Sequence, residues 1–190
     1  MTDFSTVEKN LRDRGYKVCS FGSGKEAADY LVAELKGKSV GIGGSMTIKE
    51  LGLYDRLSEG STVYWHWETG PETRADAASA QVYLTSVNGL AETGEIINID
   101  GAGNRVASTL YGHEKIYYIV GRNKLAKTYD DALWRARNIA SPKNARKLGR
   151  KTPCAVNADK CYDCKSPDRI CRGLVVMWEP MMNMEAEVIL

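Results

Sequence analysis

The chain has 190 residues, of which 43% are apolar and 26% charged, and its net charge is only +2. This composition is typical of one soluble domain spanning residues 1–190, and no nucleic-acid motif accompanies it. No apolar run approaches the roughly 18 residues of a membrane span, and the first residues lack the features of a signal peptide. We therefore expect a cytoplasmic protein that does not bind nucleic acid.

Apolar spacing and glycine or proline breaks predict strands that alternate with helices. The first half of the chain should contain a helix over residues 4–15, a strand over 16–21, a helix over 25–35, a strand over 39–43, a helix over 46–57, a strand over 62–67 and a short helix over 71–79. The second half should contain strands over 82–86 and 95–99, a helix over 104–111, a strand over 116–120, a helix over 129–139 that stops before Pro142, a cysteine loop, and strands over 174–178 and 187–190.

This alternation predicts an α/β fold, with a mainly parallel sheet covered by helices on both faces. In such sheets, ligands bind beyond the carboxyl ends of the strands. The glycine-rich turn after the strand over 39–43 is the first candidate ligand loop, and its candidate residues are Gly41, Gly43, Gly44, Ser45 and Thr47. Glycine allows a ligand to approach the backbone closely, but an ordinary strand–helix turn explains this pattern equally well.

A second candidate loop covers residues 86–105. Its candidate ligand-binding residues are Asn88, Glu92, Asn98, Asp100, Gly101, Gly103, Asn104 and Arg105, with Lys124 nearby. We expect this loop to lie beside the glycine turn, because both should follow strands of one sheet. Arg105, in bidentate fashion, and Lys124 would neutralise a small anionic ligand. Alternatively, a β-turn over residues 92–94 and a helix N-cap would use most of these polar groups structurally.

Any acid–base catalysis in that loop would need a carboxylate, and the candidates are Glu92 and Asp100. The histidines, His66 and His113, form no triad with a serine, so we interpret both as structural. Seven basic residues and no acidic one fall between residues 132 and 158. They form either a solvated helix end or a rim that attracts anions.

Four of the five cysteines cluster near the end of the chain as C-x6-C-x2-C-x6-C: Cys154, Cys161, Cys164 and Cys171. Four soft ligands in one polar loop predict a shared zinc ion or an iron–sulfur cluster. Zinc and iron–sulfur sites both accept four thiolates. Disulfides or free thiols are the alternatives, and a reducing compartment disfavours disulfides.

Three stretches resemble the lactate-utilisation (LUD) domain family: GIGGSMTIKELGL, TSVNGLAETGEIINIDGAGNRVASTLYG with VGRNKL, and SPKNARKLGRKTPC. The resemblance implies a fold of the ribose-5-phosphate isomerase and coenzyme A transferase superfamily. The cysteine tail is similar to that of one subgroup. Where isomerases of the superfamily carry acidic residues, this chain has Asn88 and Gly89, and Glu92 matches the transferase glutamate only loosely.

The resemblance implies a role in bacterial systems that oxidise lactate to pyruvate. We expect a subunit or accessory protein in oxidation of lactate, or a related 2-hydroxy acid, with an iron–sulfur centre (4Fe-4S is one option) or zinc, acting in electron transfer. Its partners would be iron–sulfur subunits, with a homo-oligomer as a further option. The alternatives are a phosphosugar- or CoA-thioester-acting enzyme with structural zinc, and a non-catalytic scaffold. Whether the chain is itself an enzyme stays open.

Overall fold

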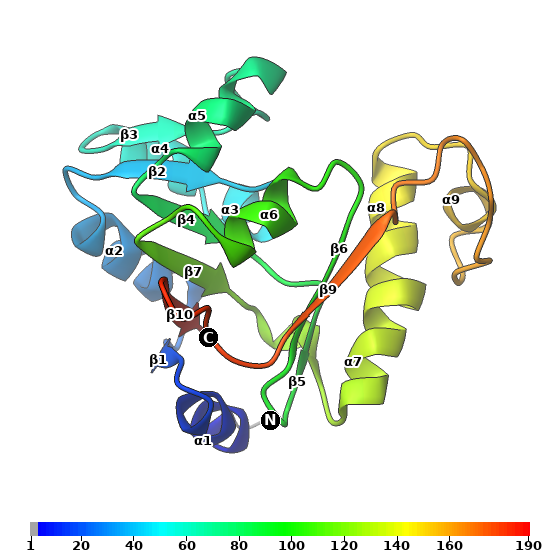
Figure 1. Ribbon diagram of the computed structural model, residues 1–190, viewed down its shortest axis with the longest axis horizontal. Coiled ribbons are helices and arrows are strands. Elements are labelled where there is room, and N and C mark those ends of the chain that lie inside the picture. Colours follow the sequence, from blue (N-terminus) through cyan, green and yellow to red (C-terminus); the bar gives the residue numbers. More distant parts are fainter. Residues whose placement is uncertain (1–3) are drawn as a thin grey trace.

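The computed structural model describes residues 4–190, and its centre is a six-stranded sheet in which every pair of neighbouring strands is parallel (Figure 1). The strand order is β1 (Lys17–Cys19), β10 (Glu185–Ile189), β7 (Lys115–Ile119), β4 (Val82–Thr85), β2 (Ser39–Ile42) and β3 (Thr62–Tyr64). The predicted α/β fold with a mainly parallel sheet is therefore confirmed.

Helices cover both faces of this sheet because its central strands are apolar on both sides. On β4, Leu84 belongs to one core cluster and Tyr83 to the other. The first face packs against α2 (Gly24–Glu34), α3 (Met46–Glu50) and α4 (Leu53–Ser58). The second face packs against α1 (Ser5–Asp13), α6 (Asn104–Leu110) and α5 (Arg74–Ala78), which follows the 3-10 turn Pro71–Thr73. The helix predicted over 46–57 is divided at Gly52, which has a φ of +60°.

A second sheet of four strands was not predicted. Its order is β8 (Leu125–Ala126), β5 (Gly89–Ala91), β6 (Ile96–Asp100) and β9 (Gly173–Met177), and it contains antiparallel pairs. The chain turns at Gly94, with a φ of +101°, so that β5 and β6 form a hairpin. The prediction that residues 95–99 belong to the parallel sheet was therefore wrong: the tight turn returns the chain antiparallel.

The helix predicted to end before Pro142 continues past it. α7 (Tyr129–Arg135) leads through a π-helical segment (Ala136–Ala140) into α8 (Ser141–Lys147). Pro142 lies in the first turn of α8, where its missing N–H group is tolerated, and the Ser141 hydroxyl donates to the Ala136 carbonyl. The widened turn lets the helix pass the proline.

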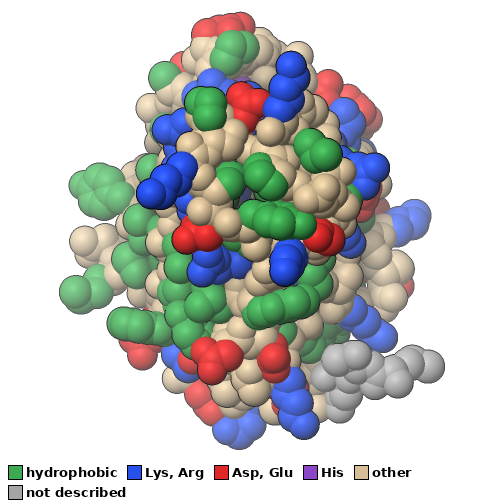
Figure 2. Space-filling model, turned by 90° about the vertical axis from the view of Figure 1, so that its right-hand side faces the viewer, with side chains coloured by type: hydrophobic (Ala, Val, Ile, Leu, Met, Phe, Trp, Pro, Cys, Tyr) green, Lys and Arg blue, Asp and Glu red, His purple; other side chains and the backbone are tan. Residues whose placement is uncertain are grey.

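After α8, the chain follows a mostly irregular path before β9. The predicted cysteine loop is present in part, because Cys154 lies on a short helix, α9 (Pro153–Asn157), while the other three cysteines lie in irregular chain. Figure 2 shows the side formed by α7 and α8, where apolar side chains gather between Lys and Arg side chains. No helix in residues 4–190 is long and apolar enough to cross a membrane.

Candidate functional site

A cavity of about 650 Å³ opens at the carboxyl ends of the central strands, within the size range of small-molecule sites. Its walls come from three regions. The first wall consists of the segments that follow β2, β3, β4 and β7, with Gly44, Ser45, Met46, Thr47, His66, Trp67, Ser86, Asn88 and Lys124. The second wall lies at the end of β6 and contains Asp100, Gly101, Asn104 and Arg105. The third wall is formed by α7, α8 and residues 167–172. We call this cavity the basic pocket.

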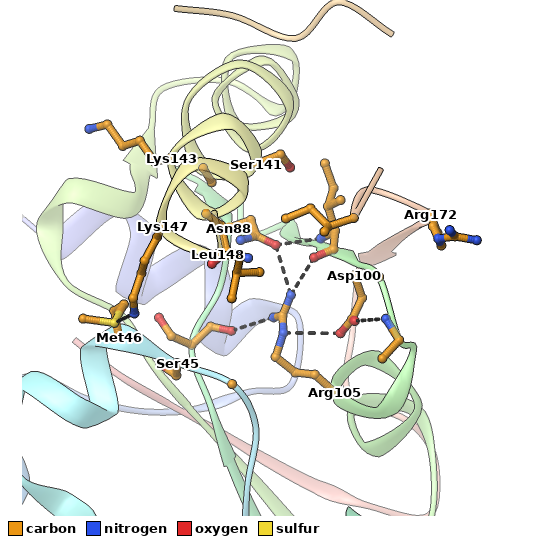
Figure 3. Close-up of a pocket in the computed structure, with 18 of the residues that line it drawn as sticks. Ser45, Met46, Asn88, Asp100, Arg105, Ser141, Lys143, Lys147, Leu148 and Arg172 are labelled. Carbon is orange, nitrogen blue, oxygen red and sulfur yellow. Dashed lines mark hydrogen bonds and ion pairs between the residues drawn. The ribbon is translucent and has the colours of Figure 1, made fainter. Parts of the chain in front are cut away.

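Arg105 holds the first two walls together (Figure 3). Its side chain is buried, and its guanidinium uses its donors on protein acceptors. Nη1 donates to the carbonyl of Ser86 (3.2 Å) and to Oδ1 of Asn98 (2.5 Å), while Nη2 donates to Oδ1 of Asn88 (3.1 Å) and to the carbonyl of Ile99 (2.8 Å). Nε lies 3.5 Å from the Asp100 carboxylate. Burial lowers the pKa of Arg105, although Asp100 opposes that shift. These hydrogen-bond donors of Arg105 are engaged by protein acceptors, so its guanidinium holds the walls of the pocket together. We expected it to bind a ligand instead.

Asp100 is likewise engaged by the protein. Its Oδ1 accepts hydrogen bonds from the backbone N–H groups of Ala102 and Gly103, both 3.1 Å away, and its other oxygen faces Arg105. These bonds form a turn before α6, whose N-cap is Gly103 without a side-chain cap, so the structural use of Asp100 is a turn and not the helix N-cap that the sequence suggested. A carboxylate held in this way by an arginine and two amides is a poor candidate for a general base.

The structure brings nine of the fourteen predicted ligand-binding residues to the basic pocket. These are Gly44, Ser45, Thr47, Asn88, Asp100, Gly101, Asn104, Arg105 and Lys124. The two loops are adjacent, since a Cβ on Gly43 would lie 2.9 Å from Cγ of Arg105. Our reason for this adjacency was wrong, because the second loop follows β6 of the four-stranded sheet.

The other five predicted residues do not line the pocket. Gly41 packs against α5, where an added Cβ would lie 2.2 Å from the carbonyl oxygen of Ala77. Gly43 lies beneath Arg105, Asn98 is fully buried, and Gly103 is the N-cap of α6.

Glu92, the second candidate catalytic carboxylate, lies at the other end of the β5–β6 hairpin from Asn88 and Asp100. Its backbone carbonyl accepts from Nδ2 of Asn10 on α1 (2.7 Å), and Arg14, the C-cap of that helix, bonds the neighbouring Thr93 and Glu95. Helix α1 therefore fixes this turn in place, away from the basic pocket.

The third wall supplies most of the charge, and the ligand loops did not reveal it. Among the described residues, two acidic side chains, Asp100 and Asp168, and nine basic ones line the pocket. The basic residues are Arg74, Arg105, Lys124, Arg135, Lys143, Lys147, Arg150, Arg169 and Arg172. Four of them, Arg135, Lys143, Lys147 and Arg150, belong to the basic run between residues 132 and 158. That run was the available signal, and the structure favours the anion-attracting rim over a purely solvated helix end.

Burial and mutual repulsion act on these cations. Burial and then the charge of Arg135 lower the pKa of Lys124, and burial and then Lys49 lower the pKa of Lys147. A bound anion would relieve both effects, because it favours the charged form of each lysine.

His66 also lines the pocket, although we interpreted it as structural. Its Nδ1 atom is buried without a hydrogen-bond partner among the described residues. Burial, and then the positive charge of Arg74, lower the pKa of His66. His113, in contrast, stacks on Tyr83 with ring centroids 4.9 Å apart and bonds the carbonyl of Ala80, as a structural histidine would.

All four clustered cysteines line a second, smaller cavity, together with Arg137 and Arg169. Nη2 of Arg137 lies 4.0 Å from Sγ of Cys161, and the backbone N–H of Asp163 donates to the same sulfur at 3.4 Å. Within residues 4–190, no three His, Cys, Asp or Glu side chains are arranged to hold a single metal ion.

The cysteine cavity and the basic pocket share a wall. Ser141, Arg169 and Ile170 line both. Arg169 donates to the backbone carbonyls of Cys171 (2.9 Å) and Cys164 (2.8 Å). On the side of the basic pocket, the backbone of Ile170 packs on Gly101: a Cβ added to Gly101 would lie 2.6 Å from the carbonyl oxygen of Ile170. The stretch between the last two cysteines is therefore also a side of the basic pocket.

The fold of this chain is shared by a protein of known structure. A DUF162 family protein from Deinococcus radiodurans is similar in structure, with a TM-score of 0.55 and 14% identity over 97% of this chain and 94% of that chain, which shows the fold alone. Ribose 5-phosphate isomerase A from Neisseria gonorrhoeae covers 55% of this chain and 53% of its own at 15% identity, with a TM-score of 0.37, too low to bear on this chain. No curated protein matches. The model of the LUD domain matches residues 5–190, and the chain therefore belongs to the LUD domain family.

Proposed function

We propose that this protein is a subunit or accessory in the oxidation of lactate, or a related 2-hydroxy acid, to pyruvate. Its basic pocket would hold a small anionic ligand, and its four clustered cysteines would hold a metal centre beside that ligand. Membership of the LUD family supports a role in lactate utilisation. The observation that carries the rest of the proposal is the wall shared by the two cavities.

Four thiols surround one small cavity, and four thiolates can bind either a zinc ion or an iron–sulfur cluster. We propose the cluster because the role in lactate oxidation needs a group that transfers electrons, which zinc cannot do. Hydrogen bonds to the sulfurs, of the kind that Arg137 and the Asp163 amide offer Cys161, modulate the potential of such a centre.

A cluster held by these residues would supply one-electron transfer. The side chains of this protein would hold the cluster in position and set the charge around it. Arg137 and Arg169 would offset the negative charge of the thiolates, and Arg169 ties the backbone at Cys164 to that at Cys171. Iron–sulfur subunits of the lactate-oxidising system would be the partners that exchange electrons with it.

Anaerobic purification followed by metal analysis and an absorption spectrum tests this proposal. We expect iron, sulfide and a brown colour. Cys161→Ser should lose the metal, whereas Cys19→Ser, on β1 and outside the cysteine cavity, is the matched control and should keep it. In the assembled lactate-oxidising system, Cys161→Ser should also stop lactate-dependent electron flow. Equal metal content in Cys161→Ser and the unaltered protein would refute the shared centre.

A colourless protein that retains zinc would instead favour the second candidate function, an enzyme acting on phosphosugars or CoA thioesters. The excess of cations in the basic pocket is the observation that favours such phosphate-bearing ligands. The engaged state of Asp100 weighs against it, because Asp168 is the only other carboxylate of residues 4–190 that lines the pocket.

A further inference from the structure

The basic pocket carries more positive charge than a single carboxylate can neutralise. Of its nine basic side chains, only Arg105 and Arg169 form ion pairs with carboxylates within residues 4–190. Both acidic side chains are already engaged, since Asp100 bonds Arg105 and two amides, and Asp168 accepts from the backbone N–H of Lys151 at 3.0 Å. Seven of the basic side chains that line the cavity therefore have no carboxylate partner within the described residues, although Arg135 and Arg172 each donate to two backbone carbonyls.

These cations do not all lie at one point. Lys143 and Lys147 come from successive turns of α8, whereas Arg172 follows the last cysteine; Figure 3 shows Lys147 and Arg172 on either side of Arg105. Between these two ends, the floor of the pocket is the saturated Arg105 network. A ligand that reaches both ends must carry an anionic group at each.

The end at Lys147 is held in position by aromatic side chains. The Lys147 ammonium lies 4.7 Å from the centre of the Trp67 ring and contacts the sulfur of Met46. Trp67 in turn stacks on the fully buried Trp65, with ring centroids 5.4 Å apart. A lysine fixed by a cation–π contact loses less side-chain freedom when it binds an anion, so its charge is positioned in advance.

We infer that the ligand of the basic pocket is a small organic acid that also carries a phosphate group, bound with one anionic group near Lys147 and the other near Arg172. This inference rests on the proposed function only in taking the pocket as the ligand site. Lactate itself bears one negative charge and would leave one end empty. A phosphate adds close to two charges and three acceptor oxygens, which suits a pocket with several unpaired lysines and arginines.

Three related compounds test the inference: 3-phosphoglycerate, glycerate, which lacks the phosphate, and glycerol 3-phosphate, which lacks the carboxylate. Calorimetry on the purified protein should give 3-phosphoglycerate an affinity at least about tenfold above either single-group compound. Added salt should reduce the affinity for 3-phosphoglycerate more than that for the other two compounds, because 3-phosphoglycerate forms the larger number of charge contacts. Equal affinities of 3-phosphoglycerate and glycerate would overturn the inference.

Two variants locate the ends. Lys147→Gln and Arg172→Gln should each reduce 3-phosphoglycerate affinity about tenfold, whereas each single-group compound should respond to only one of them. Arg146→Gln is the matched control, because Arg146 lies on α8 and is exposed but does not line the pocket. An equal loss in Arg146→Gln would show general charge attraction and refute a defined site. Metal content, measured on the same samples, reports on the proposed cysteine centre independently.

Discussion

The parallel sheet and the basic pocket treat buried charge in opposite ways. In the sheet, Lys115 of β7 lies 2.6 Å from Glu187 of β10, and the Tyr30 hydroxyl donates to the same carboxylate at 2.8 Å. Burial alone would raise the pKa of Glu187, but these bonds outweigh it and hold that pKa below its usual value. In the pocket, seven cations have no such partner among the described residues. A buried charge that another side chain neutralises stabilises the fold, whereas an unpaired cation in the pocket is available to bind an anionic ligand.

The largest expected effect comes from breaking the neutralised pair. Lys115→Met should lower the free energy of unfolding by about 3–5 kcal/mol, because it leaves Glu187, only 2% exposed, as a buried unpaired charge. Urea denaturation measures this loss. The double variant with Glu187→Gln should recover much of it, and the affinity for 3-phosphoglycerate should change in neither, since the pair is remote from the pocket's lining.

The same pair gives a pH dependence with a defined sign. Because the pKa of Glu187 is lower in the folded protein than the roughly 4.3 of an unfolded glutamate, its contribution to stability is complete above that value. It should be lost as the pH falls further, through the folded pKa. Urea denaturation between pH 7 and pH 3 should show a steeper acid decline for the unaltered protein than for the double variant.

Arg105→Lys should damage both stability and binding. Lysine cannot reproduce the planar fork that bonds Ser86, Asn88, Asn98 and Ile99 at once. We expect a loss of about 2–3 kcal/mol in the free energy of unfolding and of more than about tenfold in anion affinity. The exposed Arg146→Lys serves as control. Unchanged stability with lost affinity would mean that Arg105 grips the ligand directly, contrary to its observed contacts.

A smaller effect should connect the pocket with the cysteines. Because residues 167–172 line the pocket and lie beside the cysteine cavity, a bound ligand should slow alkylation of Cys164 and Cys171 in the metal-free protein. If this segment must open for alkylation, ligand at about ten times its Kd should slow the reaction about tenfold. Mass spectrometry of each site measures the rates, and Cys19 should react at an unchanged rate.

The smallest effect concerns His66. A bound anion should raise the pKa of His66, which burial and then Arg74 hold below its usual value. The liganded protein then binds protons more readily, so anion affinity should rise as the pH falls from about 7.5 to 6. His66→Asn should remove that part of the dependence, and NMR titration of the imidazole would measure the shift directly.

Continuous apolar runs on the central strands, separated by helical segments, were enough to predict the parallel sheet and its helices, because both faces of a buried strand must be apolar. Local pattern could not show that the β5–β6 hairpin leaves that sheet, since its docking depends on Asn10 and Arg14, far away in sequence. The polar residues of the two candidate loops correctly indicated most of the residues that form the floor of the pocket. The saturation of Arg105 was hidden, because it depends on which acceptors of two separate segments, residues 86–88 and β6, turn toward its guanidinium.

The π-helical segment between α7 and α8 has a consequence for how this chain can vary. Ala132 before the segment and Ala136 at its start pack on the second sheet; after the segment, Lys147 lines the basic pocket and Ala145 lines the cysteine cavity. Each residue turns an α-helix by about 100°, so deleting a single residue within 136–140 would rotate α8 by that angle and carry Lys147 off the pocket. Functional LUD domains with this tail should therefore tolerate changes of residue type in the segment far better than changes of its length.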